Sequence, residues 1–287
     1  MSILITGANG YISRCLDEWL TKNSSFSNVK RVSVRNGCDS FDIAKGTEAI
    51  IHTAALVHKK ESKYKEREYF DVNYSLTVQL ANKAKAAGVK QFVFLSTMAV
   101  FNQNVHVGRL YLSTTPNPTT LYGRSKLAAE KELLALADEN FTVSIVRPPM
   151  VYGPGCPGNY IQLSKLAKLT PIFPNVTNKR SMIFIDHLTE LIRQIIINRD
   201  SGIFHPQDGE YICTTKMVQE IASLHNRKVF VSKTLAILLI KLFGRTEIVS
   251  KVFGNLTYSK DMSSYRDNSY QRLCFSETIK RTESIKD

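Results

Sequence analysis

The stretch Ser2-Ile-Leu-Ile-Thr-Gly-Ala-Asn-Gly-Tyr-Ile-Ser13 decides the fold of this chain. Its apolar residues predict a buried strand, its glycines predict a turn, and the residues after Gly10 predict the start of a helix. Gly7 allows the tight turn, and Gly10 lets the backbone approach a pyrophosphate, which the free N–H groups and dipole of the helix N-terminus attract. Ser13 stands where the usual spacing has a third glycine, and it is small enough for close helix–strand packing. The stretch therefore predicts a dinucleotide site.

Apolar runs and helical patterns alternate along the chain after this stretch. Four apolar runs predict buried strands: Val29–Val34, Glu48–Ala55, Gln91–Val100 and Phe141–Pro149. Helical patterns cover Phe70–Ala87 and Lys126–Ala137. This alternation predicts an α/β fold, with a Rossmann-like doubly wound parallel sheet and a smaller C-terminal α/β lobe. The stretch from Arg35 to Glu48 leaves little room for a crossover helix, so we expect the sheet to be trimmed at this edge.

The 287 residues are enough for one large domain with a smaller lobe. We expect residues 1–150 to form the dinucleotide-binding domain, with residues 181–200 packing back on it. Residues 151–287 are expected to form the substrate lobe, which opens with the glycine/proline loop Val151-Tyr-Gly-Pro-Gly155.

Local patterns predict further elements of the lobe. Asn159 leads a helix at Tyr160–Leu169, and Pro171–Pro174 predicts a tight loop. Thr214 is expected to be a helix N-cap. The apolar run Leu235–Ile240 predicts a buried helix and is far too short to span a bilayer.

The composition limits the partners and the compartment. The net charge of +13 favours nucleotides, nucleotide sugars, nucleic acid or acidic lipid, although a basic surface that only aids solubility stays open. The basic residues form no arginine-rich arm, so we expect no nucleic-acid partner. A strand-like start at Ser2 predicts no signal peptide, and we expect no transmembrane segment. The cysteines are odd in number, widely spaced and without a Cys-x-x-Cys motif, which indicates a reducing, cytoplasmic location without a zinc site: Cys15, Cys38, Cys156, Cys213 and Cys274.

The stretch Leu121-Tyr-Gly-Arg-Ser-Lys126 carries the candidate proton-transfer residues. Tyr122 and Lys126 are four residues apart and therefore share one face of the predicted helix. A phenol titrates near ~10, and a neighbouring ammonium favours the phenolate and lowers that pKa. The pair is thus expected to exchange a proton with a sugar hydroxyl. The alternative is a surface tyrosine beside a solvated lysine.

The ends of the predicted strands supply further candidates. Ala54 and Ala55 are small and leave space for a cofactor ribose and pyrophosphate. Ser96 and Thr97 end the strand Gln91–Val100, at the edge where parallel sheets bind ligands. The Thr97 hydroxyl can hydrogen-bond the substrate oxygen whose proton is transferred.

Two histidines and the end of the second strand supply the remaining candidates, and the role of Arg35 stays open between two alternatives. His52 lies inside an apolar run and is expected in the core, whereas His58 lies at the mouth, in reach of a substrate. The end of the strand Val29–Val34 lacks the acidic residue that binds the ribose of NAD. Arg35 either faces the 2′-phosphate of NADP or lies over the adenine or in solvent.

Four separated motifs occur in a characteristic order: Thr6-Gly-Ala-Asn-Gly-Tyr-Ile12, Leu95-Ser-Thr97, Tyr122-Gly-Arg-Ser-Lys126 and Arg147-Pro-Pro-Met-Val-Tyr-Gly-Pro154. Together they closely resemble the extended short-chain dehydrogenase/reductase superfamily. Within it the chain resembles the NAD-dependent epimerase/dehydratase family, of the UDP-glucose 4-epimerase type found in bacterial surface-polysaccharide gene clusters.

This resemblance implies an NAD cofactor, with NADP as the alternative, and a nucleotide-sugar substrate, foremost a UDP-sugar. Thr97, Tyr122 and Lys126 would be catalytic, and the sugar would pass through a 4-keto form. The implied cofactor residues are Gly7, Asn9, Gly10, Tyr11, Ile12, Arg35, Asp42, Ile43, Ala54, Ala55, Ser96, Tyr122 and Lys126. The implied substrate residues are His58, Thr97, Asn159, Phe173 and Arg180.

Single residues favour or disfavour other activities that the same fold supports. A 4,6-dehydratase needs an acid and a base beside Thr97, but Met98 and Ala99 follow it, so we discount elimination of water. A 4-keto nucleotide-sugar reductase would use the same three catalytic residues and stays open. A non-catalytic sensor is disfavoured because both Tyr122 and Lys126 are present. A homodimer through the segments Tyr74–Ala87 and Leu127–Ala137 is possible, though both segments fit the core equally well.

Overall fold

The protein is described here from a computed structural model. The description covers residues 1–23, 26–57, 66–101, 108–243 and 253–283. The chain divides into two compact units, which are described separately. The first unit consists of Met1–Asn102, Thr115–Pro148 and Leu188–Pro206, and the second of Gln103–Thr114, Pro149–His187 and Gln207–Asp287. The assignment of dinucleotide binding to one and substrate binding to the other stays a prediction.

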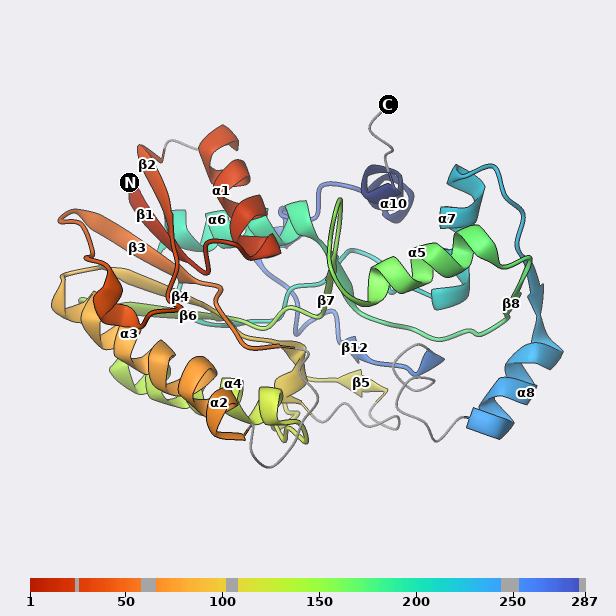
Figure 1. Ribbon diagram of the computed structural model, residues 1–287, viewed down its shortest axis with the longest axis horizontal. Coiled ribbons are helices and arrows are strands. Elements are labelled where there is room, and N and C mark those ends of the chain that lie inside the picture. Colours follow the sequence, from red (N-terminus) through yellow and green to blue (C-terminus); the bar gives the residue numbers. More distant parts are fainter. Residues whose placement is uncertain (24–25, 58–65, 102–107, 244–252, 284–287) are drawn as a thin grey trace. The chain divides into compact units, whose positions relative to one another are not determined.

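A sheet of six parallel strands forms the centre of the first unit (Figure 1). From one edge to the other it runs β10 (Gly202–Phe204), β6 (Thr142–Val146), β4 (Gln91–Leu95), β3 (Thr47–His52), β1 (Ser2–Thr6) and β2 (Asn28–Val32). The chain leaves β1 for β2 on one side and returns to β3 on the other. The strand order therefore reverses at β1, and ligands of such sheets bind at this point, beyond the carboxyl ends of the strands.

Helices cover both faces of this sheet. In Figure 1, α1 (Tyr11–Asn23) and α6 (Ile185–Asn198) lie on one face, while α2 (Glu66–Phe70), α3 (Leu76–Ala86) and α4 (Leu121–Leu136) lie on the other. Buried residues of α3, α4 and the strands form one core, for example Leu80, Leu133 and Phe92. The predicted Rossmann-like, doubly wound fold is confirmed.

The sheet is trimmed at the β2 edge, as expected. Only a short 3-10 turn, Cys38–Ser40, lies between β2 and β3, and no crossover helix is present there. Four predicted strand ends were wrong, because β2 ends at Val32, β3 at His52, β4 at Leu95 and β6 at Val146. Exposed polar residues such as Ser33 and Arg35 follow β2, whereas Ser96 and Thr97 follow β4 and lead into the 3-10 turn Met98–Val100, whose end residues are buried.

The second unit is built from three two-stranded parallel pairs and four helices among its described residues. The pairs are β7 (Met150–Tyr152) with β9 (Met182–Phe184), β8 (Ile172–Pro174) with β11 (Phe230–Ser232), and β5 (Arg109–Leu110) with β12 (Thr257–Tyr258). The helices are α5 (Asn159–Leu169), α7 (Thr214–Leu224), α8 (Lys233–Phe243) and α10 (Phe275–Glu283).

Several local predictions for this unit were wrong. Val151 lies in strand β7 and not in a loop, and the expected loop Pro171–Pro174 contributes strand β8, because distant segments pair with both. Thr214 is the first residue of α7, while Cys213 is its N-cap. The side chain of Asn178 caps this helix instead, since its Oδ1 accepts the Thr214 N–H at 2.9 Å.

Helix α8 was expected to be buried, and this was also wrong. Ile237 is 66% and Leu238 is 52% exposed, whereas Ala236 is buried. The apolar run therefore faces outward along one side of the helix. No helix within the described ranges is both long and apolar enough to cross a membrane.

Candidate active site

The glycine turn after β1 is shaped by close backbone contacts. The N–H groups of Gly7 and Ala8 donate to the carbonyl of Val32 at 3.0 and 3.1 Å. Gly7 has a φ of +90°, and a Cβ on it would lie 2.9 Å from Thr53 Oγ1 and 3.0 Å from the Ala54 nitrogen. Only glycine fits this conformation and this space.

The turn leads directly into helix α1, which begins at Tyr11. Asn9 and Gly10 are exposed there, and Tyr11 and Ile12 are half-buried. A glycine cradle in front of a helix N-terminus, at the point where the strand order reverses, fits the pyrophosphate of a dinucleotide. Ser13 is fully buried, which agrees with its expected role in close packing.

The end of β2 supplies a basic residue that the sequence analysis missed. Arg31 donates from Nη1 to the Ala8 carbonyl at 2.7 Å and from Nε to Asp17 at 2.8 Å. Arg35 lies three residues beyond the strand and is exposed. The sequence analysis ended this strand at Val34 instead of Val32 and therefore considered Arg35. The correct end of β2 draws attention to Arg31, which lies beside the glycine turn.

The remaining predicted cofactor residues lie around the same strand ends. Ala54 and Ala55 follow β3 and are half-buried. Asp42 is exposed, and Ile43 packs against the core that α3 and α4 share with the sheet. Their contact with a cofactor stays a prediction.

Thr97 and Tyr122 come together at the carboxyl end of β4. Thr97 follows the strand, its hydroxyl accepts the Ala99 N–H at 3.1 Å, and it lies close enough to the Tyr122 phenol to affect the pKa of that group. Tyr122 lies in the first turn of α4, whose N-cap is Thr120. A Cβ on Gly123 would collide with the Ala99 carbonyl and lie 2.8 Å from Pro118. Gly123 therefore lets α4 approach the strand closely enough for the pair to form, a role that sequence analysis missed.

Lys126 lies one turn further along α4 and is fully buried. Its Nζ donates to the Leu95 carbonyl at 2.9 Å and lies 4.3 Å from the centre of the Phe94 ring. Burial lowers the pKa of Lys126 to about 7, although the Glu130 carboxylate acts in the opposite direction. This ammonium is thus held beneath the strand end.

The expected lowering of the Tyr122 pKa was wrong. Burial raises the pKa of Tyr122 to about 12, because the phenolate loses its hydration, and the hydrogen bond from Thr97 only partly offsets this. Lys126 does not reverse the shift. The i, i+4 spacing predicted the shared helix face but not the balance of these effects.

Two buried polar residues brace the strand ends beneath the site. Asn73 accepts the Leu56 N–H at 2.7 Å and donates to the Leu56 carbonyl and to Ser125, both at 3.1 Å. His52 contacts the hydroxyls of Thr6 at 2.6 Å and Thr77 at 2.9 Å. Burial lowers its pKa to about 3, so His52 is a neutral core residue, as expected.

A buried ion pair on α4 was not found from the sequence. Arg147 contacts the Glu130 carboxylate through Nε at 3.0 Å and through Nη2 at 2.5 Å. The Ser96 hydroxyl donates to the same carboxylate, and Arg147 Nη1 lies 3.3 Å from His205 Nε2. Ser96, which was predicted to bind the cofactor, therefore directs its side chain into this network, and its cofactor contact stays a prediction.

The predicted substrate residues of the second unit occupy different settings. Asn159 is exposed at the start of α5, and Phe173 is buried in β8, 6.0 Å from the ring of Phe253. Arg180 donates to the Gly254 carbonyl at 3.1 Å, and burial lowers its pKa. Phe173 and Arg180 thus meet the same short segment. His58 lies outside the described residues.

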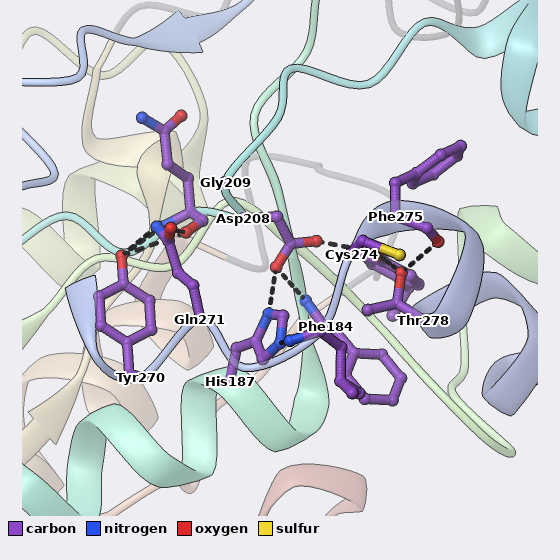
Figure 2. Close-up of polar contacts among 12 residues, drawn as sticks. Phe184, His187, Asp208, Gly209, Tyr270, Gln271, Cys274, Phe275 and Thr278 are labelled. Carbon is purple, nitrogen blue, oxygen red and sulfur yellow. Dashed lines mark hydrogen bonds and ion pairs between the residues drawn. The ribbon is translucent and has the colours of Figure 1, made fainter.

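Figure 2 shows a second buried network, which centres on Asp208. Its Oδ1 accepts from the Phe184 N–H at 3.0 Å and contacts His187 Nδ1 at 2.8 Å, and its Oδ2 accepts from the Tyr152 hydroxyl at 2.7 Å. His187 Nε2 accepts the Leu273 N–H at 3.1 Å, which places the imidazole proton on Nδ1. The network joins β7, β9 and the C-terminal segment, so its role is structural.

Residues 3–204 match the NAD dependent epimerase/dehydratase family. The chain belongs to this family. It is an NAD-dependent epimerase or a related oxidoreductase, and its cofactor is NAD or NADP. The resemblance given by its four motifs is thereby confirmed.

Three proteins similar to this chain are named as 4-epimerases of different substrates. A UDP-glucose 4-epimerase of Vibrio cholerae is 34% identical over 284 residues, which cover 89% of this chain and 86% of the relative. An N-acetyl-α-D-glucosaminyl-diphospho-ditrans,octacis-undecaprenol 4-epimerase of Escherichia coli O157:H7 is 27% identical over 56% of this chain and 50% of the relative. Among solved structures, the UDP-glucuronic acid 4-epimerase of Bacillus cereus in complex with NAD has a TM-score of 0.75 at 18% identity, over 98% of this chain and 95% of that one.

Proposed function

We propose that this protein is a UDP-hexose 4-epimerase that acts through a transient 4-keto sugar and serves surface-polysaccharide synthesis. The observation that carries the proposal is that Thr97 at the carboxyl end of β4 lies beside Tyr122 of α4, with the buried Lys126 one turn further along that helix. The name of the Vibrio cholerae relative supports the substrate class.

In this proposal the three side chains handle one proton. Tyr122 takes the proton of the sugar 4-hydroxyl and later returns it to the same oxygen of the inverted product. Thr97 hydrogen-bonds that oxygen and holds it beside the phenol. When bound, the dinucleotide supplies the acceptor and donor of the C4 hydride. Tyr122 can take this proton only as a phenolate, and with a pKa of about 12 that form is scarce at neutral pH. The proposal therefore requires a positive charge beside the phenol oxygen when the substrate is bound, which Lys126 on the same helix face would supply.

The glycine turn before α1 would hold the pyrophosphate of the dinucleotide. Asn159, Phe173 and Arg180 are the proposed contacts for the nucleotide diphosphate of the substrate. An arginine donor fork suits a diphosphate, although the fork of Arg180 already uses Nη1 to bind Gly254.

The first experiment is to denature the purified protein and identify any released dinucleotide by mass spectrometry. We expect NAD in near-stoichiometric amount, because an epimerase regenerates its cofactor in each cycle. UDP-glucose, UDP-N-acetylglucosamine and an undecaprenyl-diphosphate sugar are then offered as substrates, and the epimers are separated by chromatography.

The matched variants are Tyr122→Phe and Tyr111→Phe, because Tyr111 is a half-exposed tyrosine of the second unit. Tyr122→Phe should lower turnover by about 10²-fold or more, since proton transfer contributes that much, while dinucleotide binding is kept. Tyr111→Phe should behave as the wild type. Unchanged turnover in Tyr122→Phe would exclude the proposed mechanism.

A 4-keto nucleotide-sugar reductase is the second candidate, and the basic end of β2 favours it. Arg31 and Arg35 lie where an acidic residue would select NAD, so a 2′-phosphate finds positive charge there. A protein that is purified without dinucleotide, binds NADPH but not NADH, and reduces a 4-keto sugar without forming epimers would support this activity over epimerisation.

A further inference from the structure

Large apolar side chains are exposed on one group of elements in the second unit. They lie on the last turn of α5, on the strands β8 and β11, and on α8. The most exposed are Leu169 at 74% and Phe230 at 71%. The apolar–basic surface is defined by Leu169, Ile172, Phe230, Ile237, Leu238 and Leu242, together with the lysines of the same elements. Exposed apolar groups of this extent mark an interaction surface.

The strand pair gives this surface a defined face. Phe230 and Ile172 are register partners in the parallel pair of β11 and β8, so their side chains point to the same side. The Phe230 N–H donates to the Pro171 carbonyl at 2.9 Å, which fixes this register. Phe173, the next residue of β8, is buried on the opposite side.

Helix α8 follows β11 directly and packs on β8, so its exposed residues belong to the same group of elements. Ile237, Leu238 and Leu242 are exposed on one side of the helix, and Lys233 and Lys241 stand on that side as well. The spacing of Lys233, Ile237 and Lys241 is one residue per turn, so lysines and apolar residues share the exposed face. Lysine stems can lie along an apolar layer while their ammonium groups reach a polar boundary.

The charge of these elements is of one sign. The segments Asn159–Pro174 and Arg227–Phe243 contain no acidic residue, although the chain has 25 acidic residues among 287. They contain six basic residues: Lys165, Lys168, Arg227, Lys228, Lys233 and Lys241. Lys168 is paired with Glu283 at 2.8 Å. The surface is therefore apolar and cationic at once.

We propose that the apolar–basic surface docks on an anionic lipid bilayer. Helix α8 has 11 residues, which is too short to span a membrane but suits a helix that lies in the boundary of headgroups and acyl chains. The apolar side chains enter that boundary, and the lysines contact lipid phosphates. A symmetric contact between two copies through this face would bring lysines against lysines, which is repulsive. The proposal is independent of which sugar is the substrate.

The test is flotation of the full chain with vesicles of phosphatidylglycerol and phosphatidylcholine, compared with vesicles of phosphatidylcholine alone. We expect binding to the anionic vesicles, with about tenfold weaker binding to the neutral ones and a similar loss at high salt. Sedimentation of the protein alone in the same buffers gives its oligomeric state.

Two double variants separate the apolar and the electrostatic contributions to vesicle binding. Leu238→Gln with Leu242→Gln keeps helix propensity and should weaken vesicle binding by about tenfold or more. Lys233→Gln with Lys241→Gln should weaken binding and flatten its salt dependence. Leu134→Gln, at a partly exposed leucine of α4 outside the apolar–basic surface, is the control and should bind as the wild type does. Circular dichroism checks that every variant is folded, and the sugar conversion in solution should not change.

Three outcomes would overturn the proposal. One is equal binding to both kinds of vesicle in wild type and variants. Another is no vesicle binding by a monomeric protein, which would mean that another part of the chain or another protein covers the surface. The third is a dimer that the Leu238→Gln and Leu242→Gln pair dissociates, which would make this face a contact between copies.

Discussion

Helix α4 carries two regions in which ionisable groups are buried, and they behave in opposite ways. In its first turns, Tyr122 is half-buried beside the Thr97 hydroxyl and Lys126 is fully buried against a backbone carbonyl. Burial shifts both pKa values toward the uncharged forms, although the Glu130 carboxylate opposes this for Lys126. One turn later, Glu130 is buried against the Arg147 guanidinium in a two-bond ion pair. In the first region burial changes the proton affinities of two groups whose direct partners are uncharged, whereas in the second a buried carboxylate contacts a guanidinium. The first arrangement suits proton transfer, and the second holds the helix in place.

The largest expected effect comes from breaking the ion pair. Arg147→Met leaves the Glu130 carboxylate buried without its partner, which should lower the free energy of unfolding by about 3–5 kcal/mol. Urea denaturation measures it. The control is Arg124→Met, because Arg124 meets Glu66 at 3.7 Å with both side chains exposed, and its loss should cost under about 1 kcal/mol. Equal losses in the two variants would contradict the contrast between the regions.

A smaller effect is expected from pushing α4 away from the strand. Gly123→Ala places a Cβ against the Ala99 carbonyl, and this overpacking should cost about 1–3 kcal/mol of unfolding free energy. It should also reduce turnover, because Tyr122 would move from Thr97. Gly108→Ala is the control, since a Cβ there would meet no atom of the described residues within 4 Å. A Gly123→Ala protein with the stability and turnover of the wild type would show that the close approach of α4 is not needed.

The smallest effect, counted per pH unit, concerns the pH dependence of stability. The Lys126 pKa falls from its ordinary value of 10.5, which the unfolded chain keeps, to about 7 in the folded protein. Between these values the unfolded chain binds more protons, so the free energy of unfolding should rise with pH by about 1 kcal/mol per pH unit from this group. Lys126→Met should remove that slope from urea titrations between pH 7 and 10, whereas Lys131→Met, at an exposed lysine of α4, should keep it. A wild-type slope in Lys126→Met would assign the pH dependence to other groups.

The features that were predicted correctly from the sequence are encoded by short, continuous stretches of residues. The glycine turn before α1 and the strand end at Thr97 are each encoded within about a dozen residues, and the sheet follows from their alternation with helices. The sign of the Tyr122 pKa shift could not be predicted, because it depends on how deeply the folded chain buries the phenol. The ion pair of Glu130 with Arg147 joins residues 17 positions apart on different elements. Neither position has a local pattern that reveals its partner.

The same limit explains the elements that were wrong in the second unit. Strand β8 exists because β11, more than fifty residues later, pairs with it, and short strands of this kind have weak signals of their own. Helix α8 was expected inside because its residues are apolar. Composition alone does not tell a buried apolar helix from one that is exposed for a partner.

The trimmed edge of the main sheet has a consequence for behaviour at high concentration. Within the described part of the chain, β2 is the last strand of the sheet, so its outer backbone groups are available to a strand of another molecule. The exposed side chains of this strand include Lys30 and Arg31. Two such edges that approach each other bring their Lys30 ammonium groups together, while each Arg31 is paired with Asp17. The repulsion between the lysines opposes growth of the sheet from molecule to molecule. The shortened edge thereby stays open without becoming a seed for aggregation.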